Sequence, residues 1–145
     1  MNDLLSVVRA VHEISMVTNT RLEPVLGRLR LTAQTAQALW AIEPELPAPP
    51  MRVVAERLHC NASNLTFIAK QLEDRGYAER RRDPRDGRSS VLVLTEEGER
   101  ARGEVIAAAL EATPFAALPP AELRVLAGQL TGVAEGSESG RSKQI

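Results

Sequence analysis

Several residue types are scarce in this chain, and each scarcity excludes a class of site. Cys60 is the single cysteine among 145 residues, so the chain offers neither an intramolecular disulfide nor a multi-cysteine zinc or iron–sulfur site. Only His12 and His59 remain as histidine ligands, and we expect no metal and no cofactor. The apolar runs fall short of the roughly 18–20 residues of a membrane span, and the start at Met1 lacks a signal-peptide pattern. We therefore expect a cytoplasmic protein without membrane contact.

Aromatic residues are also few, so the core must be built from aliphatic side chains. The chain has one Trp, one Tyr and two Phe, whereas 43% of its residues are hydrophobic and 26% are charged. This balance differs from that of a disordered chain, and the length is about that of one domain. Because an aliphatic, alanine-rich core favours helices, we expect a mainly α-helical fold.

The N-terminal third has the apolar spacing of helices. Apolar residues recur with a helical period over residues 3–30. Pro24 lacks a backbone N–H, so we expect a kink or a break there. Thr32 is a suitable N-cap for a second helix. The proline-rich residues 44–50 then predict a stiff connection on the surface.

A short helix at residues 51–58, a turn at His59-Cys60 and a longer helix ending at Arg75 follow. Asn61 is a good N-cap for the longer helix, and Gly76 supplies the left-handed residue that ends it. Residues at helical spacing face the core, which leaves an exposed face that is uncharged toward its N-terminal end. The inward residues are Leu65, Ile68, Ala69 and Leu72, and the outward ones are Ser63, Thr66, Phe67 and Lys70.

A β-hairpin is predicted after this helix. Two segments of β-forming residues, 77–82 and 89–94, flank residues 83–88, whose Pro, Asp and Gly are typical of turns. Three arginines occupy the first strand and two more lie in the turn. The hairpin is therefore strongly basic.

Two further helices complete the chain. Thr95 caps one that runs to about Ala112, with glutamates in its first turn where the helix dipole favours anions. Pro119-Pro120 can open a last helix with an apolar seam. We expect the small, polar residues 136–145 to be a disordered tail. The seam consists of Leu123, Leu126, Leu130 and Val133.

This order of elements predicts a winged helix-turn-helix core, in which the second helix of the motif enters a major groove. The net charge of −1 for the whole chain gives no sign of a nucleic-acid partner. Residues 57–88, however, contain eight basic and five acidic side chains, a net charge of +3, and the rest of the chain carries −4. This asymmetry is typical of a protein that presents one positive face to DNA phosphates.

Motifs in the same region resemble those of MarR-type transcriptional regulators. Asp83-Pro-Arg-Asp-Gly-Arg88, followed by Val91-Leu-Val-Leu-Thr-Glu-Glu-Gly98, is similar to the family's wing signature, Asp-x-Arg-Asp-x-Arg, and its Leu-Thr-x-x-Gly helix start. Val54-Ala-Glu-Arg-Leu58 and Leu72-Glu-Asp-Arg-Gly-Tyr77 resemble the helix before the turn and the exit from the recognition helix. The similarity covers residues 31–103, while the flanking helices match only in length and pattern.

The resemblance implies a homodimer that binds a pseudo-palindromic operator in double-stranded DNA and regulates transcription, most often as a repressor. Recognition helices would enter successive major grooves, and wing tips would reach the flanking minor grooves. Residues 1–30 would form an N-terminal dimerisation helix, 31–95 the DNA-binding lobe, and 96–135 the C-terminal dimerisation helices. The dimer interface would combine the C-terminal seam with Leu4, Val8 and Val11.

The resemblance also implies roles for single side chains. By position, Arg88 is the minor-groove candidate and Arg85 lies near a phosphate or groove, because a narrow minor groove attracts a guanidinium. Asp86 would orient an arginine by ion pairing. Phe67 replaces an arginine of many relatives and has two interpretations, contact with a thymine methyl or packing against a neighbouring side chain. The other predicted DNA contacts are Ser63, Asn64, Thr66, Lys70 and Arg82.

Other functions find less support. The sequence has no Gly-rich phosphate loop, no paired carboxylates in an apolar setting and no nucleophile motif, so we do not expect an enzyme. A winged-helix module that binds only proteins is the alternative, although it would not require arginines at the wing tip. Many relatives release DNA when a small, often aromatic ligand binds between the dimerisation helices and the DNA-binding lobe, and we take this response, with an unknown effector, as a hypothesis here.

Three single residues have structural interpretations. Cys60 is expected to be a buried thiol and not a redox sensor, since it lies in the turn and not in the N-terminal helix. His12 is expected in the core or at the dimer interface, with an effector ligand as the alternative. Trp40 is expected in the core.

Overall fold

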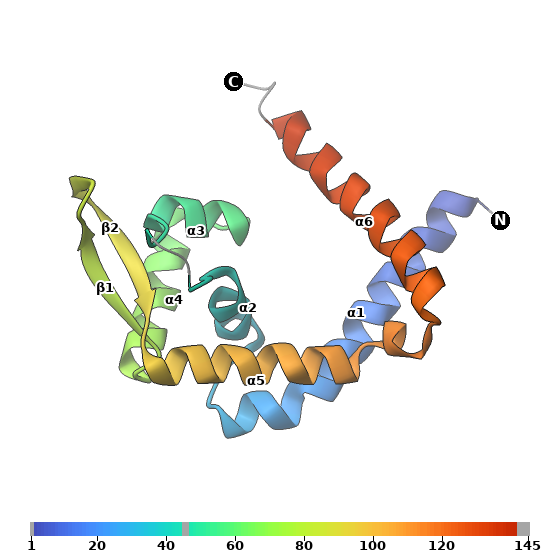
Figure 1. Cartoon of the computed structure of the whole chain (residues 1–145), viewed down its shortest axis with the longest axis horizontal. Helices are drawn as coiled ribbons and strands as arrows, with labels where there is room; N and C mark the ends of the chain where they lie inside the picture. The colour runs from blue at the N-terminus through green and yellow to red at the C-terminus, as the bar shows by residue number, and fades with distance from the viewer. Residues whose placement is uncertain (1, 45–46, 142–145) are drawn as a thin grey trace.

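The computed structural model describes residues 2–44 and 47–141 and is mostly helical with one two-stranded hairpin (Figure 1). This confirms the expected fold class. The elements are α1 Asp3–Arg28, α2 Ala33–Ala41, α3 Met51–Arg57, α4 Ala62–Asp74, β1 Ala78–Asp83, β2 Asp86–Leu94, α5 Glu96–Ala112, the 3-10 turn η1 Pro114–Ala117, and α6 Pro120–Arg141. Helices α2, α3 and α4 and the hairpin form one lobe, and α5 leads from this lobe to the region of α1 and α6 (Figure 1).

Helix α1 continues through Pro24, so the expected break does not occur. Asn2 caps the helix, and its Oδ1 accepts a hydrogen bond from the Leu4 N–H at 2.9 Å. Pro24 removes only one backbone donor. Leu22 and Leu26, which flank it, both pack against the core and hold the helix on either side of the proline.

The helix-turn-helix lobe forms at the predicted caps. Thr32 and Thr35 make a reciprocal capping box at the start of α2. Asn61 Oδ1 accepts from the Asn64 N–H at 2.8 Å at the start of α4. Between α3 and α4 the chain turns at His59, whose φ is 52°. The expected inward face of α4 is confirmed, and the fully buried side chains of the lobe include Leu39, Ile42, Val54, Leu65, Ile68, Leu72 and Leu92.

The hairpin is anchored to the segment that precedes α3. Strands β1 and β2 pair antiparallel, with an irregularity after Arg82. The turn is shorter than expected, because β2 begins at Asp86. The proline-rich connection does not lie wholly on the surface, since Pro49 is buried and Pro50 forms a bridge to Val91. Burial against the lobe removes these apolar rings from water, a tertiary effect that composition alone does not reveal.

The start of helix α5 is in close contact with Gly76 and Tyr77, which lie between α4 and β1. Thr95 Oγ1 accepts from the Gly98 N–H at 3.0 Å and donates to the Gly76 carbonyl at 2.6 Å. A Cβ atom at Gly98 would lie 1.8 Å from the Tyr77 carbonyl oxygen. Only glycine allows the backbone of α5 to lie this close to the Tyr77 carbonyl, and this contact fixes the position of the start of α5 relative to the hairpin.

Helix α6 extends away from the other elements (Figure 1). The expected disorder is wrong for residues 136–141, which continue the helix, while 142–145 lie outside the described residues. No proline interrupts this stretch. Ser137 Oγ donates to the Ala134 carbonyl at 2.7 Å, so its hydroxyl is bonded within the helix.

The long terminal helices leave many apolar side chains uncovered. Leu4 of α1 is 69% exposed and Val133 of α6 is 74% exposed. Within the described ranges, no helix is long and apolar enough to cross a membrane. Rows of exposed apolar side chains on helices are typical of surfaces that pack against another protein.

Candidate nucleic-acid interface

Helix α4 presents an exposed face made of the residues that the sequence predicted. Its buried stripe packs into the lobe, and its outward residues are all exposed. Thr66 Oγ1 donates to the Ala62 carbonyl at 2.9 Å, so the hydroxyl proton is used within the helix. Lys70 Nζ lies 3.4 Å from Asp74 Oδ1 in an exposed ion pair. The outward residues are Ser63, Asn64, Thr66, Phe67 and Lys70.

Phe67 is the exception on this polar face. Its side chain is 63% exposed, so most of the ring is not packed against a neighbouring residue. Packing against a neighbouring side chain therefore covers only part of the ring, and contact with a thymine methyl stays a prediction.

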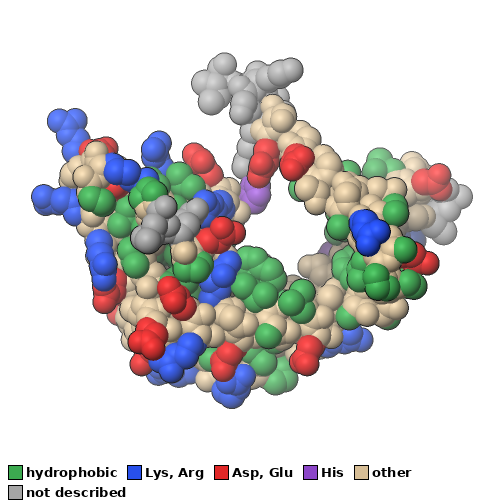
Figure 2. Space-filling view, in the orientation of Figure 1, with side chains coloured by type: hydrophobic (Ala, Val, Ile, Leu, Met, Phe, Trp, Pro, Cys, Tyr) green, Lys and Arg blue, Asp and Glu red, His purple; other side chains and the backbone are tan. Residues whose placement is uncertain are grey.

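The hairpin places a dense set of arginines beside α4. Arg80, Arg81 and Arg82 are all exposed on β1, and Arg88 is exposed on β2. Only Arg81 pairs within the strand, since its Nε lies 3.1 Å from Glu79 Oε2. Basic side chains accordingly gather over the hairpin in Figure 2. Because α4 packs against β1, the exposed helix face and the basic wing belong to the same lobe.

Among the described residues, Asp86 does not form the ion pair expected of it. Its Oδ1 accepts from the Arg88 backbone N–H at 3.0 Å, and its Oδ2 accepts from Ser89 Oγ at 3.2 Å. The carboxylate therefore shapes the backbone of the turn and positions Arg88 through the main chain.

Asp83 is the carboxylate that holds an arginine, and the sequence analysis missed it. Arg85 Nε lies 3.0 Å from Asp83 Oδ1, and Arg85 Nη2 lies 3.3 Å from Oδ2. Arg85 Nη2 also donates to the Ala48 carbonyl at 2.7 Å. The predicted contact of Arg85 with DNA thus competes with a structural role, because the guanidinium ties the hairpin to the segment before α3. The available signal was the turn spacing Asp-x-Arg, which puts the two side chains within reach.

The same contacts set the protonation of Asp83. The residue is only 4% exposed. The side-chain hydrogen bond from Arg85, followed by the bond from the Arg85 backbone N–H, lowers the pKa of the carboxyl below its usual value. Asp83 is therefore ionised at neutral pH.

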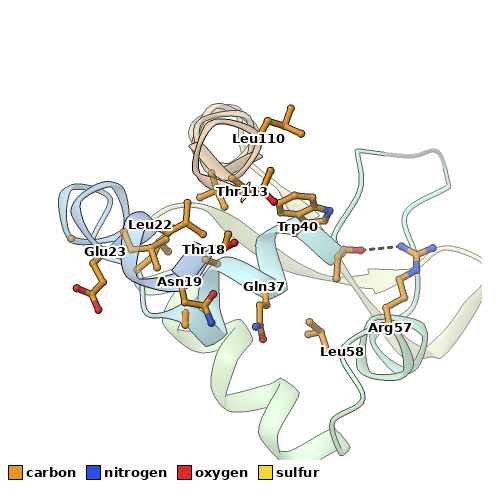
Figure 3. Close-up of a pocket in the computed structure, with 18 of the residues that line it drawn as sticks. Thr18, Asn19, Leu22, Glu23, Gln37, Trp40, Arg57, Leu58, Leu110 and Thr113 are labelled. Carbon is orange, nitrogen blue, oxygen red and sulfur yellow. Dashed lines mark hydrogen bonds between the residues drawn. The ribbon is translucent and has the colours of Figure 1, made fainter. Parts of the chain in front are cut away.

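A cavity of about 1090 Å³ lies where the lobe meets the long helices (Figure 3). It is lined mainly by apolar side chains of α1, α2 and α5, with uncharged polar groups and the charged residues Glu23, Glu43 and Arg57 among them. Trp40 was expected in the core, but it is 43% exposed and lines this cavity. Other lining residues include Thr18, Asn19, Leu22, Leu26, Gln37, Leu58, Val105, Leu110 and Thr113.

Arginine side chains tie together the helices around the cavity. Arg102 of α5 donates from Nε and Nη2 to the Trp40 carbonyl, both at 3.3 Å. Arg21 of α1 donates to the Ala112 carbonyl of α5 at 2.8 Å. Arg57 donates to the Ala41 carbonyl at 3.0 Å (Figure 3). The cavity walls are therefore coupled to both the lobe and the long helices.

Cys60 and His12 were also given structural interpretations from the sequence. Cys60 is half-buried and packs against the core, close to the buried position expected. His12 is exposed on α1, so the core interpretation is wrong, while a place at the dimer interface stays a prediction. Over the part of the chain that is described, no group of three or more His, Cys, Asp or Glu residues could hold a metal ion.

The predicted dimer residues lie on the uncovered faces of α1 and α6. Leu4, Val8 and Val11 are exposed on α1. On α6, Leu123 and Leu126 are half-buried, whereas Leu130 and Val133 are exposed. A single copy of the chain therefore does not cover either face.

Solved structures share this architecture. CouR from Rhodococcus jostii RHA1 bound to p-coumaroyl-CoA is 26% identical, with a TM-score of 0.71 over 90% of this chain and 89% of that one. AbsC, a MarR family transcriptional regulator from Streptomyces coelicolor, is 21% identical, with a TM-score of 0.78 over 96% and 97%. Sco3205 from Streptomyces coelicolor, in complex with DNA, is 23% identical, with a TM-score of 0.73 over 94% and 89%.

The sequence itself points to the same relatives. None of the functionally curated proteins matches the chain. The family model described as the MarR family matches residues 31–89, which span α2 to the hairpin. Lobe sequence and whole-chain fold thus agree: the lobe is similar to the MarR family in sequence, and the chain shares its fold with solved MarR family transcriptional regulators.

Proposed function

We propose that the protein is a sequence-specific transcriptional regulator that binds double-stranded DNA as a homodimer. The proposal rests on one observation: α4 packs against the arginine-rich hairpin, and the outward face of α4 and the arginines of the hairpin are both exposed. A helix of this kind fits the major groove, and arginines on a wing suit the flanking minor groove and phosphates. Sco3205, which shares the fold, was solved in complex with DNA.

Within this proposal, the two halves of the interface have different tasks. The side chains of α4 read base edges, and the wing adds affinity through charge. Arg88 is the residue we assign to the minor groove, because it is exposed and its backbone is held by Asp86. Binding alone accounts for this activity, and we assign no catalytic role to the chain.

Substitution of Arg88 tests the assignment. Arg88→Ala is expected to weaken binding to an operator duplex at least tenfold and to reduce the slope of affinity against salt by about one. Fluorescence anisotropy at several salt concentrations measures both. Arg124→Ala, which removes an exposed arginine from α6, is the matched control and should change neither quantity. Unchanged affinity of the Arg88 variant would contradict the wing assignment, and a wild-type protein that binds no duplex would favour a protein-binding module.

We further propose that the protein represses transcription and releases DNA when a small, largely apolar molecule fills the cavity. The cavity is lined by residues of α2 in the DNA-binding lobe and by residues of α1 and α5. CouR, which is 26% identical to this chain, was solved bound to p-coumaroyl-CoA. In the homodimer, a ligand would act by favouring a distance between the DNA-binding lobes of the two copies that does not match the distance between successive major grooves.

Trp40 provides the readout for this response. It is the single tryptophan and lines the cavity, so its fluorescence should report a ligand there. A panel of phenolic and aromatic acids would be screened in this way, with each binder tested for release of DNA. By linkage, DNA must weaken ligand binding by the same factor by which the ligand weakens DNA binding. Ligands that change the fluorescence without changing DNA affinity would contradict the proposal.

A further inference from the structure

Phe67 is an exposed aromatic side chain on α4. Among the residues of the lobe that the structure describes, two large apolar side chains are exposed, Trp40 and Phe67. Trp40 lines the cavity. Phe67 does not line it and is 63% exposed, although the neighbouring Leu65 and Ile68 on the same helix are each 1% exposed. An aromatic ring left in water next to a well-packed core points to contact with something outside the chain.

The neighbours of Phe67 toward the N-terminal end of the helix are small and uncharged. Ser63 lies one turn before it and Thr66 lies beside it, and residues three and four apart share a helix face. The hydroxyl proton of Thr66 is donated to the Ala62 carbonyl, which leaves its methyl group and a lone pair for other contacts. The nearest cation on this face, Lys70, is paired with Asp74. The middle of α4 therefore presents one apolar ring among small polar side chains.

The major groove presents one apolar group on its base edges, the C5 methyl of thymine. A phenyl ring cannot donate or accept the hydrogen bonds by which guanine, adenine and cytosine are read. Apolar side chains that wedge between base pairs do so from the minor groove, which a recognition helix does not enter. The thymine methyl is therefore the group in the major groove that matches Phe67.

We propose that Phe67 is a specificity-determining residue that contacts thymine methyl groups in the operator. The inference rests on the proposed function, since it requires α4 to lie in the major groove. It predicts thymine in each half-site at the base pairs that face the middle of α4. An arginine at this position would instead read guanine.

Removal of single methyl groups from the DNA tests the contact directly. An operator is first selected from a randomised duplex library with the full-length wild-type protein. Each thymine is then replaced by deoxyuridine, which keeps its base pairing and lacks only the methyl group. We expect one thymine in each half-site to be sensitive, with affinity lowered about fourfold for each methyl lost and about 15-fold when both half-sites are changed.

Variants of the helix show whether Phe67 is the group that senses the methyl. Phe67→Ala should bind the thymine and deoxyuridine operators equally, and Phe67→Leu, which keeps an apolar side chain, should retain part of the preference. Lys70→Ala is the matched control, because loss of a phosphate contact should weaken both operators by the same factor. Thermal unfolding of Phe67→Ala should match that of the wild type, since the ring is largely unpacked.

Each outcome has a clear meaning. Equal wild-type affinity for all deoxyuridine operators would overturn the inference and leave the proposed function standing. A preference that is as large in Phe67→Ala as in the wild type would also overturn it. If the library yields no preferred sequence, the proposed function fails and the inference fails with it.

Discussion

The arginines at the tip of the wing have different surroundings. The Arg85 guanidinium is held by Asp83 and by the Ala48 carbonyl. The Arg88 guanidinium has no hydrogen bond or ion pair within residues 2–44 and 47–141 and is exposed. Two arginines of one motif thus reach different surroundings, because the first faces a buried carboxylate and the second follows the turn.

The pair of Asp83 and Arg85 predicts a pH dependence of stability. Because Arg85 lowers the pKa of Asp83 in the folded protein, the ionised carboxylate stabilises the fold. This contribution is complete above the unfolded pKa of about 3.9 and is lost as the pH falls through the lower folded value. Urea unfolding should show a lower midpoint for Asp83→Asn at neutral pH, with the difference from wild type shrinking below about pH 4.

An exposed carboxylate provides the control for this measurement. Asp74 belongs to an ion pair whose side chains are both mostly exposed, so Asp74→Asn should change the midpoint little at any pH. A difference between Asp83→Asn and wild type that is independent of pH would contradict the stabilising role of the charge.

For single residues, the sequence predicted the helix caps correctly, but it did not predict which aspartate of the wing pairs with an arginine. Thr32, Asn61 and Thr95 cap helices as expected, because a cap involves only residues within one turn. Whether Asp83 or Asp86 pairs with an arginine depends on the turn geometry and on the position of the preceding proline segment, which lies far away in the sequence.

Helices and strands are placed by a few close contacts at their ends. Gly98 lets the start of α5 meet the Tyr77 carbonyl, whereas Gly103, farther along α5, has no atom within 4 Å of its would-be Cβ. The sequence motif predicted a helix start here, but the close approach depends on how the hairpin folds back. Likewise, the exposure of Trp40 follows from the arrangement of α1, α2 and α5 around a cavity, which apolar spacing alone does not determine.

Two glycines of α5 give a matched pair of stability predictions. Gly98→Ala should destabilise the protein by about 1–3 kcal/mol, because the added methyl overlaps backbone that must shift. Gly103→Ala should stabilise it by about 0.5–1 kcal/mol, because alanine favours the helix and meets no obstacle. Urea unfolding at equilibrium measures both changes. Equal effects of the two substitutions would show that Gly98 is not at a close contact.

At the scale of the whole molecule, the exposed apolar faces of α1 and α6 are the surfaces that we propose to pair in a dimer. Helices α1 and α6 expose apolar rows that one copy does not cover, and α6 stands apart from the lobe (Figure 1). The sequence predicted both rows from their helical spacing. It placed the end of α6 too early, because the polar residues after Val133 carry no apolar signal although they continue the helix.

Charge introduced into the α6 seam should separate the dimer. Leu130 is 44% exposed in the single chain, so Leu130→Asp should leave the lobe folded and yield monomers with greatly weakened DNA binding. Thr131→Asp adds the same charge outside the seam and should remain dimeric. Sedimentation velocity measures the assembly, and anisotropy measures the binding. A monomeric Leu130→Asp protein that binds a palindromic duplex with full affinity would contradict the dimeric mode of recognition.

The measurement that tests the central claim most directly compares two duplexes of equal length at physiological salt. One carries the DNA upstream of the protein's own gene, and the other has the same base composition in shuffled order. We predict that the wild-type protein binds the first about a thousandfold or more tightly than the second. Equal affinity for the two duplexes would contradict the assignment of the protein as a sequence-specific DNA-binding regulator.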